Sequence, residues 1–178
     1  MTIAVLLTGA LLSFVLVVLI RAESCSTGFS RVGNKCYYVS LEAANWHVAD
    51  RKCRKLGADL MVFEDAQDQE LTIAHLKSHG LTFTDVWHQS VWVGINCLGA
   101  RRNFTLSKTG DPVPFLNWVP REPDNATPEE DCVAFANYRR AFGYHDIECN
   151  YEFSYVCETP VSNNYLCAKQ ELFTAATL

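Results

Sequence analysis

The chain has 178 residues, eight cysteines and a formal net charge of −5. This length fits one ordinary domain with a hydrophobic core, and an acidic chain without a basic run lacks the electrostatic footprint of a DNA- or RNA-binding protein. The cysteines behind an apolar leader indicate an oxidising compartment and a disulfide frame, and the absence of a Cys-x-x-Cys pair argues against a zinc site.

The chain begins with an apolar segment. Residues 3–20 are almost entirely apolar and are followed by Arg21 and Ala22. A membrane-spanning helix needs about 20 apolar residues, and an anchor whose domain lies outside would need basic residues before the span, where this chain has none. The small residue Ala22 suits a cleavage site. We therefore predict a signal peptide over residues 1–22, a secreted protein and no membrane span in the mature form, with a retained signal anchor as the alternative.

Turn residues between two cysteines follow the leader. Cys25 and Cys36 bracket Gly28 and the turn at residues 32–34, a pattern that predicts a small hairpin closed by its own disulfide. Aromatic and β-branched residues at 35–39 then predict a strand.

Two helices are predicted next. Ser40 is a candidate N-cap for the first, in which apolar residues such as Trp46 and Cys53 recur at helical spacing until the stop at Gly57. The second helix is expected over residues 65–79, because its apolar residues stay in register and a glycine follows.

A core strand and a long loop occupy the middle of the chain. The β-branched run at residues 91–95 contains Trp92 and predicts the central strand of the core. Periodicity then stops over residues 96–113, where glycine, proline and basic residues accumulate. A loop of this length inside a compact domain is usually functional.

The stretch from Glu122 to Cys157 concentrates carboxylates among three cysteines. Several carboxylate oxygens held in a cross-linked, loop-rich frame are the ligands that calcium selects. The residue types in this stretch therefore favour a site for a hard cation.

These segments resemble the C-type lectin-like domain family. Its signature is Glu-Pro-Asn or Gln-Pro-Asp, then Glu-Asp-Cys, Trp-Asn-Asp, Cys and Phe-Ile-Cys-Glu, after a Trp-Ile-Gly-Leu core motif. The matching residues are Trp92-Val93-Gly94-Ile95, Glu122-Pro123-Asp124, Glu130-Asp131-Cys132, Tyr144-His145-Asp146, Cys149 and Tyr155-Val156-Cys157-Glu158. The resemblance implies an α+β C-type lectin-like fold, with two helices flanking small antiparallel sheets, a long loop region and a disulfide frame. The expected division is a signal peptide at 1–22, the domain at 25–158 and a C-terminal tail at 159–178.

The resemblance also implies the disulfide pairing. It pairs Cys25 with Cys36, Cys53 with Cys157, and Cys132 with Cys149. Cys97 and Cys167 are left over, and they can bridge each other or link the chain to a partner. We prefer the internal bridge.

One calcium site and a sugar site are implied on the acidic stretch. The resemblance assigns Glu122, Asp124, Glu130 and Asp146 as calcium ligands, and these four with His145 as carbohydrate-binding residues. The Glu122–Pro123 peptide bond is cis in such domains, and a cis X-Pro bond marks a specified loop.

Two of these positions depart from the family pattern. Asp124 stands where an amide is expected, and an ionised aspartate accepts hydrogen bonds but donates none. His145 replaces an asparagine, and a ring nitrogen is a poor calcium ligand beside oxygen. Glu-Pro-Asp matches neither the mannose-type nor the galactose-type motif, so the sugar specificity is not carried over.

Two N-glycosylation sequons lie near this stretch. Asn103 is in the long loop and Asn125 is in the calcium loop. A glycan on Asn125 would crowd a face that binds sugar.

Two functions follow from these observations. The first is a secreted, calcium-dependent carbohydrate-binding C-type lectin of atypical specificity, whose partner is a glycan or glycoprotein. The alternative is a non-carbohydrate domain of the same fold that binds a protein partner without calcium, which Asp124, His145 and the Asn125 sequon favour. An enzyme is not expected, because the chain has no nucleophile elbow and no Ser/His/Asp arrangement.

Overall fold

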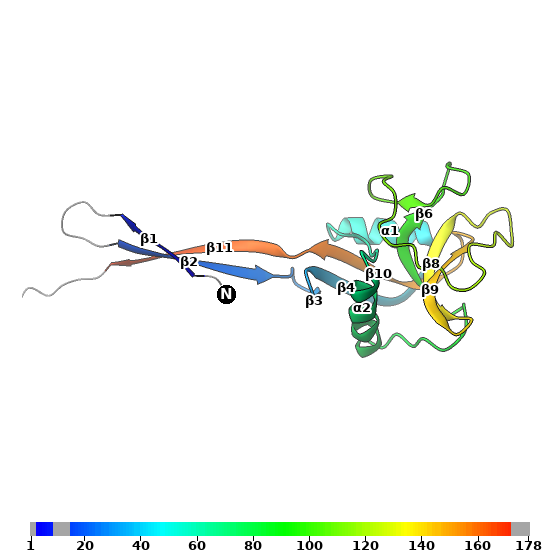
Figure 1. The fold of residues 1–178 in the computed structure, drawn as a ribbon, viewed down its shortest axis with the longest axis horizontal. Coiled ribbons are helices and arrows are strands. Elements are labelled where there is room, and N and C mark those ends of the chain that lie inside the picture. The colour runs from blue at the N-terminus through cyan, green and yellow to red at the C-terminus, as the bar shows by residue number, and fades with distance from the viewer. Residues whose placement is uncertain (1–2, 9–14, 172–178) are drawn as a thin grey trace, which may run out of the picture. The chain divides into compact units, whose positions relative to one another are not determined.

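The computed structural model describes residues 3–8 and 15–171, with side chains described for residues 24–162. The chain divides into two compact units. One unit combines residues up to Ser26 with those from Val161 onward, and the other is Thr27–Pro160 (Figure 1).

The first unit is a three-stranded antiparallel sheet of order β1-β2-β11. Its strands are β1 (Ile3–Thr8), β2 (Val15–Ser24) and β11 (Ser162–Glu171). Strands β1 and β2 coincide with the predicted signal peptide, whose cleavage stays a prediction. Among residues 3–8 and 15–171, no helix has the length and apolar character needed to cross a membrane.

The second unit is built on one mixed sheet of order β3-β4-β10-β6-β8-β9, with β5 beside β10 and β7 beside β6. Its strands are β3 (Ser30–Val32), β4 (Lys35–Ala44), β5 (Asp59–Leu60), β6 (Val91–Asn96), β7 (Thr105–Leu106), β8 (Cys132–Tyr138), β9 (Ala141–Ile147) and β10 (Phe153–Pro160). The neighbours along this order are antiparallel except β10 and β6, which run parallel. The α+β class is confirmed, with a mixed sheet instead of separate antiparallel ones.

Both predicted helices are present. Helix α1 (Trp46–Lys55) is capped by Asn45, whose side chain accepts from Val48 N at 3.0 Å. The prediction of Ser40 as the cap is wrong, because residues up to Ala44 extend strand β4 along β10. Here the sheet pairing outweighed the local preference of serine for a cap. Helix α2 (Ala66–Ser78) begins and ends within one residue of the prediction.

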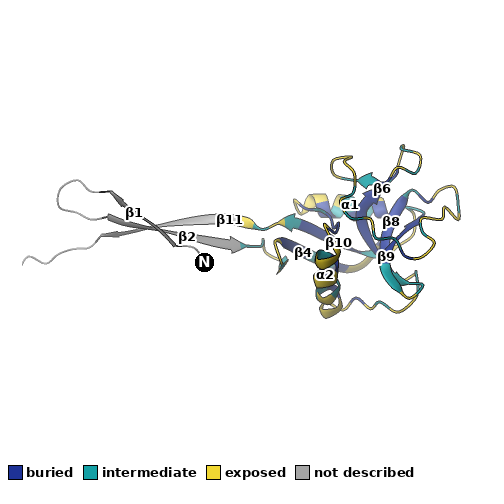
Figure 2. Cartoon of the chain, viewed as in Figure 1, coloured by how far each residue is buried: buried dark blue, intermediate teal, exposed yellow. Residues whose placement is uncertain are grey.

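The core of the second unit lies along the strands, as the dark blue segments of Figure 2 show. One cluster of buried side chains surrounds Phe63 and Phe135, and a second surrounds Trp92 and Trp46. Trp92 is fully buried, and its Nε1 donates to Ala44 O at 2.7 Å. The prediction of a central core strand is confirmed, because β6 contributes Val93 to the first cluster and Trp92 to the second.

Disulfides cross-link this unit. Cys53–Cys157 joins α1 to β10, and Cys132–Cys149 joins β8 to the segment after β9. Cys25 and Cys36 are each disulfide-bonded as well.

One predicted bridge is wrong. Cys97 has a free, buried thiol that donates to Asp131 Oδ1 at 3.3 Å. It directly follows the buried strand β6 and is only 1% exposed, so its sulfur is held within the core of its own unit. The predicted Cys97–Cys167 bridge is not formed, and the Cys167 side chain lies outside the described residues.

Candidate functional site

The predicted site forms where the segment before Glu122 runs alongside β9. Val119 N donates to Tyr144 O at 2.9 Å, and Tyr144 N donates to Asn117 O at 2.7 Å. A Cβ on Gly143 would lie 2.6 Å from Asn117 O, so glycine is required for this close approach. The Glu122–Pro123 bond that follows is cis, as the resemblance implied.

Three predicted residues come together here. Glu122, Asp124 and Asp146 each offer a carboxylate oxygen, and these oxygens all lie within 4.8 Å of one another. We call these three residues the carboxylate cluster. Asp146 organises it, because its two oxygens accept from the backbone nitrogens of Asp124 and Asn125, each at 3.1 Å.

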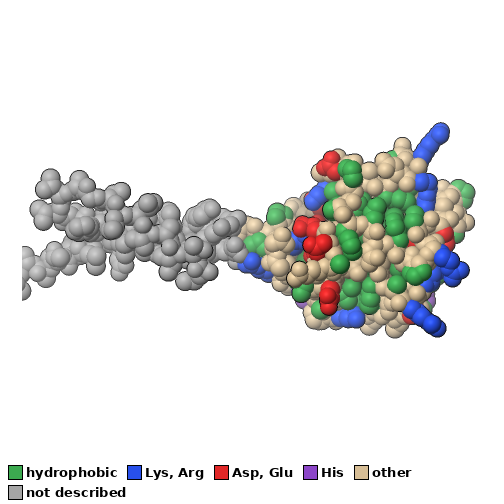
Figure 3. Space-filling view, in the orientation of Figure 1, with side chains coloured by type: hydrophobic (Ala, Val, Ile, Leu, Met, Phe, Trp, Pro, Cys, Tyr) green, Lys and Arg blue, Asp and Glu red, His purple; other side chains and the backbone are tan. Residues whose placement is uncertain are grey.

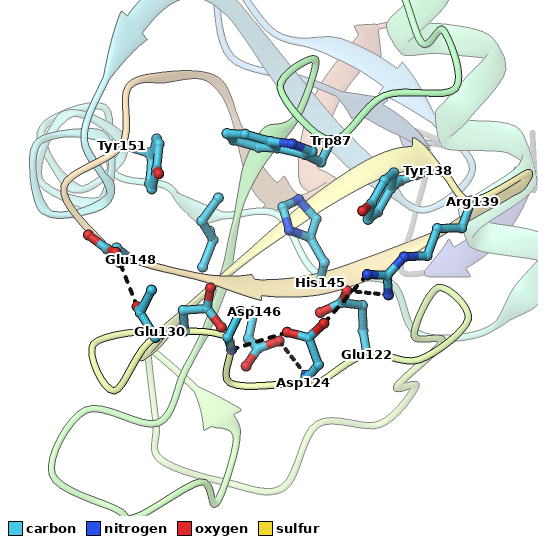
Figure 4. A pocket seen from close by; sticks show the side chains of 13 residues that line it. Trp87, Glu122, Asp124, Glu130, Tyr138, Arg139, His145, Asp146, Glu148 and Tyr151 are labelled. Atoms are coloured by element: carbon cyan, nitrogen blue, oxygen red, sulfur yellow. Dashed lines mark hydrogen bonds and ion pairs between the residues drawn. The ribbon is translucent and has the colours of Figure 1, made fainter.

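Two arginines that sequence reasoning missed neutralise the carboxylate cluster. Arg139 lies 2.7 Å from Glu122 and 3.5 Å from Asp124 (Figure 4). Arg102 lies 2.5 Å from Asp146. Arg102 also donates to Glu130 O at 2.9 Å. Both guanidinium groups therefore occupy positions where they compensate charge that a bound metal ion would otherwise balance.

The backbone of both arginines is in the left-handed region. Their φ angles are 54° for Arg139 and 67° for Arg102. Arg139 and Arg140 form the two-residue turn between β8 and β9, where Asn-Gly is the preferred pair. A side chain in this region costs conformational energy, so the sequence accepts strain at the turn that supplies a cation to the cluster. The sequence signal for it is an adjacent arginine pair between two strand-like runs.

Basic side chains are also visible on the surface. On the face drawn in Figure 3, Lys and Arg side chains gather over the loops near β8 and β9. Arg101, Arg121 and Arg140 are all exposed and have positive φ.

Burial controls the charge of the cluster. The pKa of Glu122 is raised to about 8, chiefly by burial and then by the neighbouring Asp146 and Asp124 carboxylates, which together outweigh Arg139. Burial also acts to raise the pKa of Asp146, but Glu122 and Arg102 stabilise its anion and the net direction is downward. The cluster thus carries less than its full negative charge near neutral pH.

Glu130, the fourth predicted calcium ligand, is not one of the three carboxylates within 4.8 Å of each other. It is buried, and its Oε2 has no hydrogen-bond partner among the described residues. Burial and the nearby Asp146 raise its pKa. An unsatisfied buried carboxylate oxygen is costly, which makes this atom a natural acceptor for a ligand.

His145 is placed differently from the carboxylates. It is 3% exposed, and burial lowers its pKa to about 4, so the ring is neutral at pH 7. Its Nε2 lies 2.8 Å from Ser90 Oγ, and the Ser90 hydroxyl donates to Trp87 O. A hydroxyl has one proton, so Nε2–H of His145 is the donor to Ser90.

A cavity of about 180 Å³ opens beside these groups. Glu122, Asp124, Glu130, Asp146 and His145 all line it, together with Trp87, Tyr138 and Tyr151. Figure 4 shows the aromatic side chains across the cavity from the carboxylates. The sequence carried no signal for Trp87, which lies in a segment without periodicity.

Both predicted glycosylation sites are exposed. Asn125 Oδ1 accepts from Arg102 Nη1 at 3.1 Å. This hydrogen bond does not use the side-chain nitrogen, which is the atom that would carry a glycan. Glycosylation at Asn103 and Asn125 stays a prediction.

Comparison with known proteins gives consistent matches. The family model described as the Lectin C-type domain matches residues 42–159. C-type lectin 37Db of Drosophila melanogaster is 33% identical over 127 residues, which are 71% of this chain and 79% of that protein. Human lithostathine has a TM-score of 0.65 at 24% identity and covers 77% of this chain and 91% of its own. A calcium-independent type II antifreeze protein also has a TM-score of 0.65, at 20% identity, with 79% and 98% covered. Lithostathine and the antifreeze protein are both similar to this chain in fold.

Proposed function

This chain belongs to the Lectin C-type domain family, and we propose that it is a secreted, calcium-dependent carbohydrate-binding lectin of atypical specificity. Its membership of a lectin family that is not enzymatic, and its similarity to proteins named as lectins, support a binding function. The ligand class proposed here is a glycan or glycoprotein, bound at the carboxylate cluster.

The observation that carries this proposal is the convergence of three carboxylates in a lined cavity. Their oxygens lie within 4.8 Å of each other, and Glu130 lines the same cavity and has an Oε2 atom without a hydrogen-bond partner among the described residues. Calcium takes six to eight oxygen ligands, and these donor types fit it. Glu122, Asp124 and Asp146, joined by Glu130, would hold the ion. A calcium ion held there would supply coordination for hydroxyl groups of a sugar.

The atypical specificity has a physical basis in the hydrogen-bond donors. Glu122 and Asp124 accept hydrogen bonds when ionised, and the Nε2 proton of His145 is used by Ser90. The donors beside the carboxylate cluster are therefore the guanidinium groups of Arg139 and Arg102. A sugar bound here would meet arginine donors, because Asp124 and His145, which stand where the family pattern has amides, have no proton free to donate.

Binding to immobilised glycans tests this proposal. The purified protein is applied with calcium and again with a chelator, beside Glu122→Gln and the control Glu70→Gln, which removes an exposed carboxylate on α2. We expect a signal that needs calcium, is lost in Glu122→Gln and is kept in Glu70→Gln. Equal binding in calcium and chelator would contradict the calcium-dependent reading.

A protein partner bound without calcium is the second candidate function. The observation that favours it is the neutralisation of the carboxylate cluster by Arg102 and Arg139, which lets the loop hold its shape without a metal ion. Silence on glycans in both conditions, together with a melting temperature that calcium leaves unchanged, would select this candidate.

Secretion is proposed from the predicted signal peptide and from the disulfides, which form in oxidising compartments. Expression of the full chain in animal cells tests it. We expect the protein in the medium with an N-terminus directly after Ala22. Retention in the membrane fraction with the leader intact would support a signal anchor instead.

A further inference from the structure

Two histidines meet at the C-terminal end of helix α2. His75 lies in the last turn and His79 is the C-cap residue, so the two side chains are one helical turn apart on the same face. Their ring centroids are 4.1 Å apart. We call these two residues the histidine pair. Neither of them lines the cavity beside the carboxylate cluster.

Hydrogen bonds fix the tautomer of His79. Its Nδ1 lies 3.0 Å from His75 O and 3.2 Å from Ser78 Oγ. A carbonyl oxygen only accepts, and the Ser78 hydroxyl already donates its proton to His75 O at 2.7 Å. Nδ1 of His79 therefore carries the hydrogen, and Nε2 of the neutral ring has a free lone pair. Metal-binding histidines have this arrangement, in which the other ring nitrogen donates to a carbonyl or carboxylate oxygen.

His75 also has a ring nitrogen that lacks a partner. Its Nε2 is buried and has no hydrogen-bond partner among the described residues. Burial, and then the neighbouring His79, lower the pKa of His75, so its ring is predominantly neutral at pH 7. The ring of the buried Tyr37 lies 6.1 Å away and anchors His75 to the core. An unpaired buried nitrogen costs free energy, which a bound ligand would recover.

The chemistry of this helix end favours a cation of the zinc type. The carbonyl end of a helix carries partial negative charge. Lys77, in the same turn, has its ammonium group over the ring of Phe142 on strand β9, at 4.9 Å from the centroid. Two histidines four residues apart on one helix face have the spacing of helical zinc sites. Imidazole nitrogen suits zinc, whereas calcium takes oxygen ligands.

The histidine pair supplies half of a zinc coordination shell. Structural zinc sites have four protein ligands in a tetrahedral arrangement, and catalytic sites have three with a water molecule. Within the described part of the chain, the carboxylate cluster is the only group of three or more side chains placed to hold a metal ion, so no third histidine, cysteine or carboxylate joins the pair. A second copy related by a twofold axis would present the same two histidines and complete the shell.

Exposed leucines flank the histidine pair. Leu71, one turn before His75 on α2, is 47% exposed, and Leu41 on β4 is 59% exposed. A Cβ on Gly80, which follows His79, would lie 3.5 Å from Leu41 Cδ1, so Leu41 is at the same helix end. These apolar side chains are surface that a second copy docked on this face would bury.

We propose that His75 and His79 are half of a zinc site that a second copy of this chain completes, which gives a zinc-dependent dimer with four imidazole ligands. Leu41 and Leu71 lie in the interface of this dimer. The cysteine spacing argues only against a thiolate zinc site and leaves an imidazole site open. The zinc site is separate from the proposed calcium and sugar site, and it does not depend on the sugar-binding function.

Sedimentation velocity of the purified full chain tests the shared site. The protein is measured in chelator, in excess calcium, and in excess calcium with added zinc, so that calcium competes for the carboxylate cluster. We expect zinc to double the sedimenting mass and calcium alone to leave it unchanged. His79→Gln should abolish the doubling, and His75→Gln should do the same. His47→Gln, which changes an exposed histidine on α1, is the matched control and should dimerise as the wild type does.

His79 is exposed, so His79→Gln should keep the melting temperature of the wild type in chelator. Leu41→Asp gives a variant outside the metal ligands, and it should weaken the zinc-dependent dimer at least tenfold by placing a charge in the interface. An unchanged sedimenting mass of the wild type in zinc, or a dimer of His79→Gln equal to that of the wild type, would overturn the shared site.

Cobalt in place of zinc gives a spectroscopic readout. Tetrahedral Co²⁺ absorbs visible light much more strongly than octahedral Co²⁺ does. The wild type should therefore develop an intense visible band at one cobalt ion per two chains, and His79→Gln should not. A weak spectrum of the octahedral kind would mean that water fills the shell, which contradicts the contribution of a second copy.

Discussion

Two acidic clusters in this molecule are neutralised by basic side chains in different ways. The first is the carboxylate cluster with Arg102 and Arg139. The second, which we call the lysine cluster, places Lys35 Nζ 2.8 Å from Asp68, 3.3 Å from Glu158 and 3.6 Å from Glu64. Lys35 also donates to Val62 O at 2.7 Å.

The basic groups differ in burial and in support. The Lys35 side chain is 8% exposed and comes from strand β4, which lies between β3 and β10 in the sheet. The side chains of Arg102 and Arg139 are 32% and 22% exposed and come from turns with positive φ. A buried ammonium group that joins a sheet to a helix is part of the scaffold, whereas guanidinium groups on exposed turns can exchange with a ligand. The comparison shows that similar charge composition gives a buried structural cluster in one place and a more exposed candidate site in another.

Removing the basic group of the lysine cluster should have the largest effect. Lys35→Met leaves the buried carboxylate of Glu158 without its partner, and breaking a buried pair in this way costs about 3–5 kcal/mol. Urea unfolding measures the change, with Lys55→Met on the exposed surface of α1 as the control. A loss no larger than that of the control would show that the lysine cluster is not structural.

The second-largest effect should be a pH dependence of stability that comes from Glu158 in the lysine cluster. Burial raises the pKa of Glu158 to about 7, although Lys35 acts in the opposite direction. Because this pKa is above the unfolded value, the contribution of Glu158 to stability is present below about pH 4.5 and is lost as the pH rises through 7. The unfolding free energy of the wild type should fall by on the order of 2 kcal/mol between pH 5 and pH 8, and Glu158→Gln should not show this fall.

Urea unfolding of the wild type and Glu158→Gln across this pH range checks that sign. Glu152→Gln, which changes the exposed glutamate directly before β10, is the control. Parallel stability curves for the wild type and Glu158→Gln would mean that Glu158 titrates normally.

Arg139→Gln should have a smaller effect on stability and a clear effect on the response to calcium. Removing a partly exposed ion pair costs about 1 kcal/mol without calcium. It also frees Glu122 and Asp124, so the calcium-induced rise in melting temperature should be larger than in the wild type. Arg140→Gln is the matched control, because it changes the other arginine of the same turn, with the same backbone conformation.

Thermal unfolding of these variants with calcium and with a chelator gives the comparison. If Arg139→Gln and Arg140→Gln respond to calcium identically, Arg139 does not compete with the ion.

The smallest expected effect concerns the strain of the turn. Arg140 has φ 62°, and glycine is favoured at this second position of the turn between β8 and β9. Arg140→Gly should stabilise the protein by about 0.5 kcal/mol and keep the backbone hydrogen bond from residue 140 to Asp85. Urea unfolding measures this gain, and a loss of stability would mean that the Arg140 side chain contributes contacts of its own.

Much of the scaffold could be predicted from the sequence. Helix α2 and strand β6 were located from periodicity and from their end signals, because such patterns reflect which face of one element is buried. The carboxylates of the site were assigned because short motifs along the chain resemble those of the C-type lectin-like family. These features depend on neighbouring residues, so a linear pattern is sufficient to locate them.

Other features required the tertiary structure. The arginines at the carboxylate cluster, the hydrogen bond from His145 to Ser90, and the placement of Trp87 each join segments that are distant in sequence. Their meeting depends on strand register, on the turn between β8 and β9, and on the approach that Gly143 permits. The sequence alone identified the acidic side chains, whereas packing decided which basic and aromatic groups face them, because side-chain approach is set by how separate elements pair in space.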